Sequence, residues 1–62
     1  MKGYYQLVIA MLKQHGYIFL RTGKGSHELW SNGIRHQTVS TNMPARDMAN
    51  LIMKQARINH KF

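Results

Sequence analysis

Residues 16–40, which read GYIFLRTGKGSHELWSNGIRHQTVS, decide the fold. Aromatic and branched side chains are frequent in three short segments of this stretch, residues 17–22, 26–31 and 34–40, as they are in β-strands. Gly23-Lys24-Gly25 separates the first two segments, and Asn32-Gly33, a strong hairpin signal, separates the second from the third. Because both connections are too short for a crossover, we expect a three-stranded antiparallel meander.

A helix is predicted immediately before this sheet. Apolar residues between Tyr4 and Leu12 recur with helical spacing. Gly16 stands where it would end the helix in the left-handed conformation that glycine adopts without strain. In such a cap the next residue, Tyr17, packs back on Leu12.

A second helix is predicted after the sheet. Asn42 is expected to cap its start, with Pro44 tolerated in the first turn because the first-turn amides lack helical partners. Residues 58–62 are expected to fray. The expected buried stripe consists of residues at helical spacing, namely Met48, Leu51, Ile52 and Gln55 or Ala56.

The predicted architecture is therefore a single α+β domain over residues 1–62, in the order α-β-β-β-α. Its two layers are a three-stranded antiparallel sheet and two helices that cover one face of it. Side chains alternate along a strand, so residues 17, 19 and 21 oppose residues 18, 20 and 22. Both sets are apolar enough to form a core, which leaves the open face of the sheet undetermined at this point.

Charge restricts the possible functions. Nine Lys and Arg against two Asp and Glu give a formal charge of +7 on 62 residues, which favours a polyanionic partner such as nucleic acid. The scarcity of carboxylates argues against a Mg²⁺ site, and four His without Cys show no zinc-site spacing, so neither a metal nor a cofactor is expected. The apolar run over residues 7–12 is too short to span a membrane.

The turn Lys24-Gly25-Ser26-His27 is the first candidate site. Glycines let the backbone approach a ligand closely and leave amides free for phosphate oxygens, so Gly25 and Ser26 belong to the candidate phosphate-binding set. Arg21 and Lys24 would hold phosphate, and the His27 imidazole would take a proton from a ribose 2′-hydroxyl or give one to the leaving oxygen. The alternative is a partly buried edge histidine beside an ordinary turn.

Further candidates lie outside this turn. His36, beside Arg35, would be the second member of an acid/base pair with His27, or a solvated strand residue. Trp30 is either a stacking platform for a base or, more commonly for a lone Trp, part of the core. A basic surface for phosphates would combine six side chains, unless they are dispersed for solubility: Arg21, Lys24, Arg35, Lys54, Arg57 and Lys61.

These features together resemble the HicA (YcfA-like) toxin family. The resemblance covers about residues 5–58, and its most specific parts are Gly25-Ser26-His27 and the closing run LIMKQARI over residues 51–58. The run LKQHGY over residues 12–17 and the basic residues Arg21 and Lys24 also contribute to it. The chain departs from the family in the segment TNMP over residues 41–44, which no His follows, in Arg46-Asp47-Met48, and at Arg57, where Gly is common.

The resemblance implies a fold like that of the double-stranded RNA-binding domain and an RNase activity on messenger RNA. It implies a HicB-type antitoxin as the cognate partner, and it maps the family's catalytic histidine onto His27. From the residues and the resemblance together we expect a cytoplasmic, metal-independent endoribonuclease toxin of a type II toxin–antitoxin system. The alternatives are a non-catalytic RNA- or DNA-binding module of the same fold, and a domain whose basic face docks an acidic protein.

Overall fold

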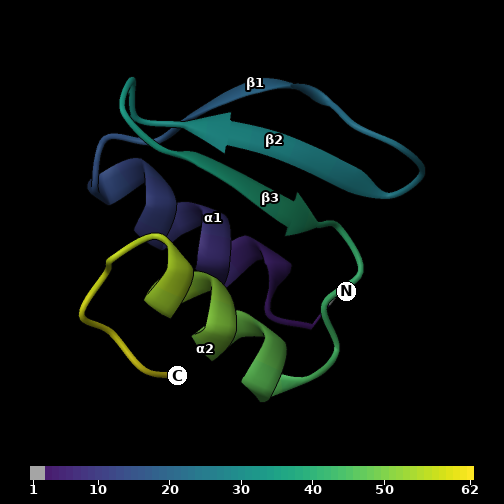
Figure 1. Ribbon diagram of the computed structural model, residues 1–62. Helices are drawn as coiled ribbons and strands as arrows, with labels where there is room; N and C mark the ends of the chain where they lie inside the picture. Colours follow the sequence, from purple (N-terminus) through teal and green to yellow (C-terminus); the bar gives the residue numbers. More distant parts are fainter. Residues whose placement is uncertain (1–2) are drawn as a thin grey trace.

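The computed structural model describes residues 3–62, so the first two residues of the expected domain lie outside it. The order of elements confirms the predicted α+β architecture, with a three-stranded antiparallel sheet in the order β1-β2-β3. Both helices lie on one side of this sheet, α1 and α2 next to each other (Figure 1). The elements are α1 (Tyr5–Gln14), β1 (Ile18–Thr22), β2 (His27–Ser31), β3 (His36–Ser40) and α2 (Arg46–Gln55).

The end of α1 confirms the predicted glycine cap. Gly16 has a φ of +85°, and its amide donates to the Lys13 carbonyl at 3.1 Å. The Tyr17 amide donates to the Leu12 carbonyl at 2.9 Å, which completes a Schellman motif. Leu12 and Tyr17 are both buried in the core. This cap therefore sets the angle at which the chain leaves α1 and enters the sheet.

The start of α2 differs from the prediction. The residue before the helix is Ala45 in an extended conformation, with no side-chain cap, and Pro44 precedes the helix instead of standing in its first turn. Asn42 is bound through its backbone to the Ser40 hydroxyl. Met43 forms a β-bridge with Gly3 and accepts a 2.8 Å hydrogen bond from the Tyr4 amide. Because this bridge holds the chain extended, the helix begins only after it.

The buried stripe of α2 is also displaced from the predicted one. Ile52 and Ala56 are buried as expected, but Met48 and Leu51 are 38% and 53% exposed. The residues that take their places in the core are Ala49 and Met53. Burial of the small Ala49 side chain lets this face of the helix pack closely. The rest of the core comes from α1, the sheet and the segments next to α2, and consists of Val8, Leu12, Tyr17, Trp30, Val39, Met43 and Ile58.

The strand register identifies the open face of the sheet. Trp30 and Val39 are buried, and Gln37 donates to the Gln55 side chain of α2 at 2.9 Å, so these residues face the helices. The covered face contains two rows of paired residues, Phe19–Trp30–Gln37 and Thr22–Glu28–Val39. The opposite, open face contains the rows Ile18–Ser31–His36, Arg21–Leu29–Thr38 and His27–Ser40. β3 begins at His36, two residues later than predicted, because Gly33 and Ile34 belong to the turn.

The edge strand β1 contains an irregularity. Phe19 pairs with Trp30 and Arg21 with Leu29, so Leu20 is an extra residue and forms a β-bulge. All five residues of β1 are exposed. The bulge shifts the alternation so that Arg21 comes onto the open face.

Residues 58–62 are packed against the helices, whereas the sequence suggested fraying. Arg57 has a φ of +61°, and the Ile58 amide donates to the Met53 carbonyl at 2.9 Å, so α2 ends in the same motif as α1. Ile58 is buried. The Phe62 amide donates to the Asn50 side chain at 2.8 Å, and the Phe62 ring lies 5.8 Å from that of Tyr4.

Candidate nucleic-acid interface

The β1–β2 turn places His27 at the first position of β2. Gly25 has a φ of +62°, and the His27 amide donates to the Lys24 carbonyl at 3.2 Å, which is the pattern of a turn with glycine at its first central position. The Gly23 amide donates to the His27 carbonyl at 2.7 Å. A Cβ at residue 23 would lie 3.4 Å from that carbonyl oxygen, in ordinary van der Waals contact. The turn therefore binds the backbone of His27 at both groups, its amide to the Lys24 carbonyl and its carbonyl to the Gly23 amide.

His27 lies in a hollow that also brings Arg21 and Lys24 together. The hollow has a volume of about 290 Å³ and is lined by Arg21, Gly23, Lys24, His27, Glu28, Leu29 and Thr38. The Arg21, Lys24 and His27 side chains are exposed, so the imidazole is not the partly buried edge residue of the alternative interpretation. The arrangement places two cations beside an imidazole, which can bind a phosphate and exchange a proton with it.

The nearest carboxylate, Glu28, is engaged on the helix side of the sheet. Its Oε1 atom accepts hydrogen bonds from the Tyr5 hydroxyl at 2.7 Å and from the Trp30 indole at 3.1 Å. Burial raises the pKa of Tyr5 to about 12, and the hydrogen bond and negative charge of Glu28 add to the rise. The lone Trp30 is 3% exposed and is a core residue, so it cannot stack on a base.

His36 and Arg35 lie at the opposite end of the open face. The register pairs His27 with Ser40 and Ser31 with His36, so the two histidine rows lie four residue positions apart along β2. At about 3.3 Å per residue this distance is about 13 Å. The structure therefore does not bring His27 and His36 together as a pair acting on one bond. Arg35 belongs to the β2–β3 turn, where its amide donates to the Asn32 side chain at 2.7 Å.

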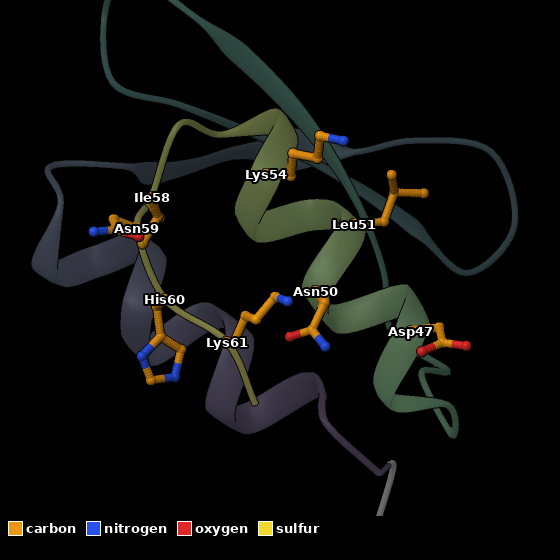
Figure 2. Close-up of a pocket in the computed structure, with 8 residues that line it drawn as sticks. All are labelled: Asp47, Asn50, Leu51, Lys54, Ile58, Asn59, His60 and Lys61. Carbon is orange, nitrogen blue, oxygen red and sulfur yellow. The ribbon is translucent and has the colours of Figure 1, made fainter.

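Lys54 lies in the helical layer and away from the His27 hollow. It lines a separate hollow of about 450 Å³ between α2 and the C-terminal segment, together with Asp47, His60 and Lys61 (Figure 2). Lys54 and Leu51 project from α2, while His60 and Lys61 come from the segment that follows it (Figure 2). The predicted basic surface is thus divided, with Arg21 and Lys24 at His27, Arg35 at the far end of the sheet, and Lys54 and Lys61 among the helices.

The structure adds site residues that sequence reasoning did not identify. Leu29 and Thr38 line the His27 hollow, and Ser40 pairs directly with His27. A second hollow, of about 270 Å³, is lined by Gly16, Ile18, Leu20, Ser31, Asn32 and Gly33. Its strand residues belong to the open face. These residues could have been found by assuming the register that the two hairpin turns imply, but the bulge at Leu20 gives no sequence signal.

Within residues 3–62, no three His, Asp or Glu side chains gather closely enough to hold a metal ion, and no helix is long and apolar enough to cross a membrane. No known protein family, curated protein or solved structure matches the chain.

Proposed function

We propose that this protein is a HicA-like endoribonuclease toxin that cleaves single-stranded messenger RNA in the cytoplasm. The observation that carries this proposal is the exposed His27 imidazole, which shares a hollow on the open sheet face with Arg21 and Lys24. The formal charge of +7 supports a polyanionic substrate. RNA supplies its own nucleophile, the 2′-hydroxyl, so a site without clustered carboxylates is sufficient for the reaction.

The proposed reaction divides the chemistry among three side chains. Arg21 and Lys24 bind the non-bridging oxygens of the phosphate and stabilise the negative charge that builds up on them. His27 accepts the proton of the 2′-hydroxyl as its oxygen attacks phosphorus. The O2′–P bond forms and the P–O5′ bond breaks, and the leaving oxygen takes a proton from water. The products are a 2′,3′-cyclic phosphate and a free 5′-hydroxyl.

The decisive experiment incubates a long single-stranded RNA with the native chain, His27→Ala and His60→Ala in EDTA. We expect the native chain and His60→Ala to cut the RNA and His27→Ala to be slower by at least about a hundredfold, the usual contribution of a general base. His60 is the matched control because it lies in the C-terminal segment beside α2. Cyclic phosphate ends on the fragments are expected as well.

Two results would reject the ribonuclease. Equal cleavage by His27→Ala would remove His27 from the reaction. RNA binding without cleavage by the native chain would instead favour the non-catalytic binding module. The absence of a second histidine beside His27 in the register gives that alternative its structural basis.

A HicB-type antitoxin is the proposed protein partner. The exposed apolar side chains of β1 and the cations around His27 form a surface that an acidic partner would complement. Such a partner would cover His27, so its addition should stop cleavage and raise the melting temperature. Undiminished cleavage with excess antitoxin would contradict this assignment.

A further inference from the structure

The second hollow of the open face, which we call the Ile18 hollow, lies along β2 from the His27 hollow. It is lined by Gly16, Ile18, Leu20, Ser31, Asn32 and Gly33. Ile18 and Ser31 form one row with His36, and Leu20 is directly followed by Arg21 of the His27 hollow. The two hollows are therefore consecutive features of one surface, and a single extended ligand can lie in both.

The lining of the Ile18 hollow fits a nucleobase. Ile18 and Leu20 are 63% and 45% exposed, so two neighbouring large apolar side chains of the same hollow are open to solvent. Asn32 stands at the rim, and its Oδ1 atom accepts the amides of Ile34 and Arg35 at 2.9 and 2.7 Å. The group that Asn32 offers to a ligand is therefore its NH₂, a donor to base oxygens and ring nitrogens. An apolar floor with a polar rim suits the flat face and polar edge of a base.

Two basic side chains beside this hollow, Arg35 and His36, are placed to contact the backbone of the same RNA strand. His36 pairs with Ser31, which lines the hollow, and Arg35 precedes His36. Both side chains are exposed. The spacing of about 13 Å between the His27 and Ser31 rows spans about four stacked nucleotides at 3.4 Å each, or fewer in an extended strand. Single-stranded RNA, whose unstacked bases can turn into a pocket, is the occupant that satisfies the apolar floor and the charges together.

We propose that the Ile18 hollow is a subsite for a base of the bound RNA, up to about four nucleotides from the phosphate at His27, with Arg35 and His36 contacting the adjoining RNA backbone. This inference rests on the proposed function, because it assumes that the RNA bound at His27 continues along the sheet to the Ile18 hollow. It gives His36 a role in binding in place of the acid/base role suggested by its residue type.

Binding measurements in a His27→Ala background test the subsite without cleavage. Ile18→Ala and Leu20→Ala should each weaken the binding of an octanucleotide by about tenfold, the loss expected for a partly buried aliphatic contact. They should leave the binding of a dinucleotide, which reaches only the His27 hollow, unchanged. Leu51→Ala is the matched control, since Leu51 is 53% exposed on α2 and lies outside this hollow.

A second measurement locates the base. In a series of octanucleotides, each lacking one base, removal of the base at one particular position should weaken binding. The same removal should have no effect on binding to Leu20→Ala, because that variant has already lost the contact. Equal weakening of octanucleotide and dinucleotide, or no position-dependent loss, would overturn the subsite. Arg35→Ala should weaken only the octanucleotide, which provides an independent check if an apolar variant folds poorly. Cleavage by the native chain is measured separately, so a binding protein that does not cut RNA would overturn the proposed function while the length-dependent losses still supported the subsite.

Discussion

A single arginine occupies the most strained backbone position described among residues 3–62. Arg57 has a φ of +61°, the left-handed region, which costs a residue with a Cβ about 1 kcal/mol or more. The position closes α2, because the Ile58 amide reaches the Met53 carbonyl only when residue 57 turns this way.

Arg57→Gly should therefore stabilise the protein. We expect a gain of about 1 kcal/mol in the free energy of unfolding, less a few tenths for the lost interaction of the cation with the helix dipole. In a domain of this size that gain raises the melting temperature by about 4–8 °C. Arg57→Ala is the control, because it removes the charge and keeps the strain, and it should not stabilise. A melting temperature for Arg57→Gly at or below that of Arg57→Ala would contradict the argument.

Tyr5 links stability to alkaline pH. Its pKa is raised from 10.0 to about 12 in the folded protein, so the unfolded chain loses this proton at a lower pH than the folded one. The stabilisation is fully present below pH 10 and is lost as the pH rises from 10 to about 12. Tyr5→Phe cannot ionise, so its melting temperature should fall less steeply over this interval. Parallel curves for the two proteins would show that Tyr5 does not contribute.

At the scale of the elements, the sequence predicted those ends of helices and strands that depend on residues close together in the chain. The cap of α1 and the positions of both hairpins depend on Gly16, on the glycines around Lys24 and on Asn32-Gly33, and all were predicted. The start of α2 was not, because the bridge between Gly3 and Met43 joins segments far apart in the sequence. The buried face of α2 was misassigned for a similar reason. Ala49 is buried by packing, while its small side chain carries little hydrophobic signal.

Substitutions in the β1–β2 turn can separate its effect on the position of His27 from its effect on the stability of the fold. Gly25 and Gly16 both have positive φ, and a Cβ would meet no atom within 4 Å at either position. Alanine at each should cost about 1 kcal/mol of stability through backbone strain alone. Gly25→Ala should also displace His27 and reduce cleavage at saturating RNA. Gly16 lines the Ile18 hollow, so Gly16→Ala is expected to change RNA affinity and to leave the rate at saturating RNA near the native value. Equal rates at a temperature where both variants are folded would show that the turn does not position His27.

For the whole molecule, the division of charge between two layers gives a prediction about salt. Arg21 and Lys24 line the His27 hollow on the open sheet face and Arg35 lies in the β2–β3 turn, whereas Lys54 lies in the helical layer. For single-stranded RNA each neutralised phosphate contributes about 0.7 to the slope of log affinity against log salt. Arg35→Ala should lower the slope by about that amount in the His27→Ala background, and Lys54→Ala should leave it unchanged. An equal effect of both substitutions would place the RNA across both layers.

The candidate site was only partly accessible to sequence reasoning. The turn around His27 was identified because its glycines and cations are contiguous, and Arg21 came with it as the end of the preceding strand. The distance between His36 and His27 depends on how β2 and β3 pair, and the sequence did not determine that pairing. The Ile18 hollow depends on the bulge at Leu20 and on the identity of the open face, both of which are properties of the assembled sheet.

The bulge at Leu20 also affects how the protein behaves when it is concentrated. A strand edge that exposes Ile18, Phe19 and Leu20 next to free backbone groups is the kind of surface on which chains self-assemble into fibrils. An extra residue in that edge twists it and breaks the regular spacing that a second copy would need for pairing. We therefore expect the irregularity that places Leu20 in the Ile18 hollow to oppose edge-to-edge pairing as well, and a redesign that straightened β1 for rigidity to lose both effects together.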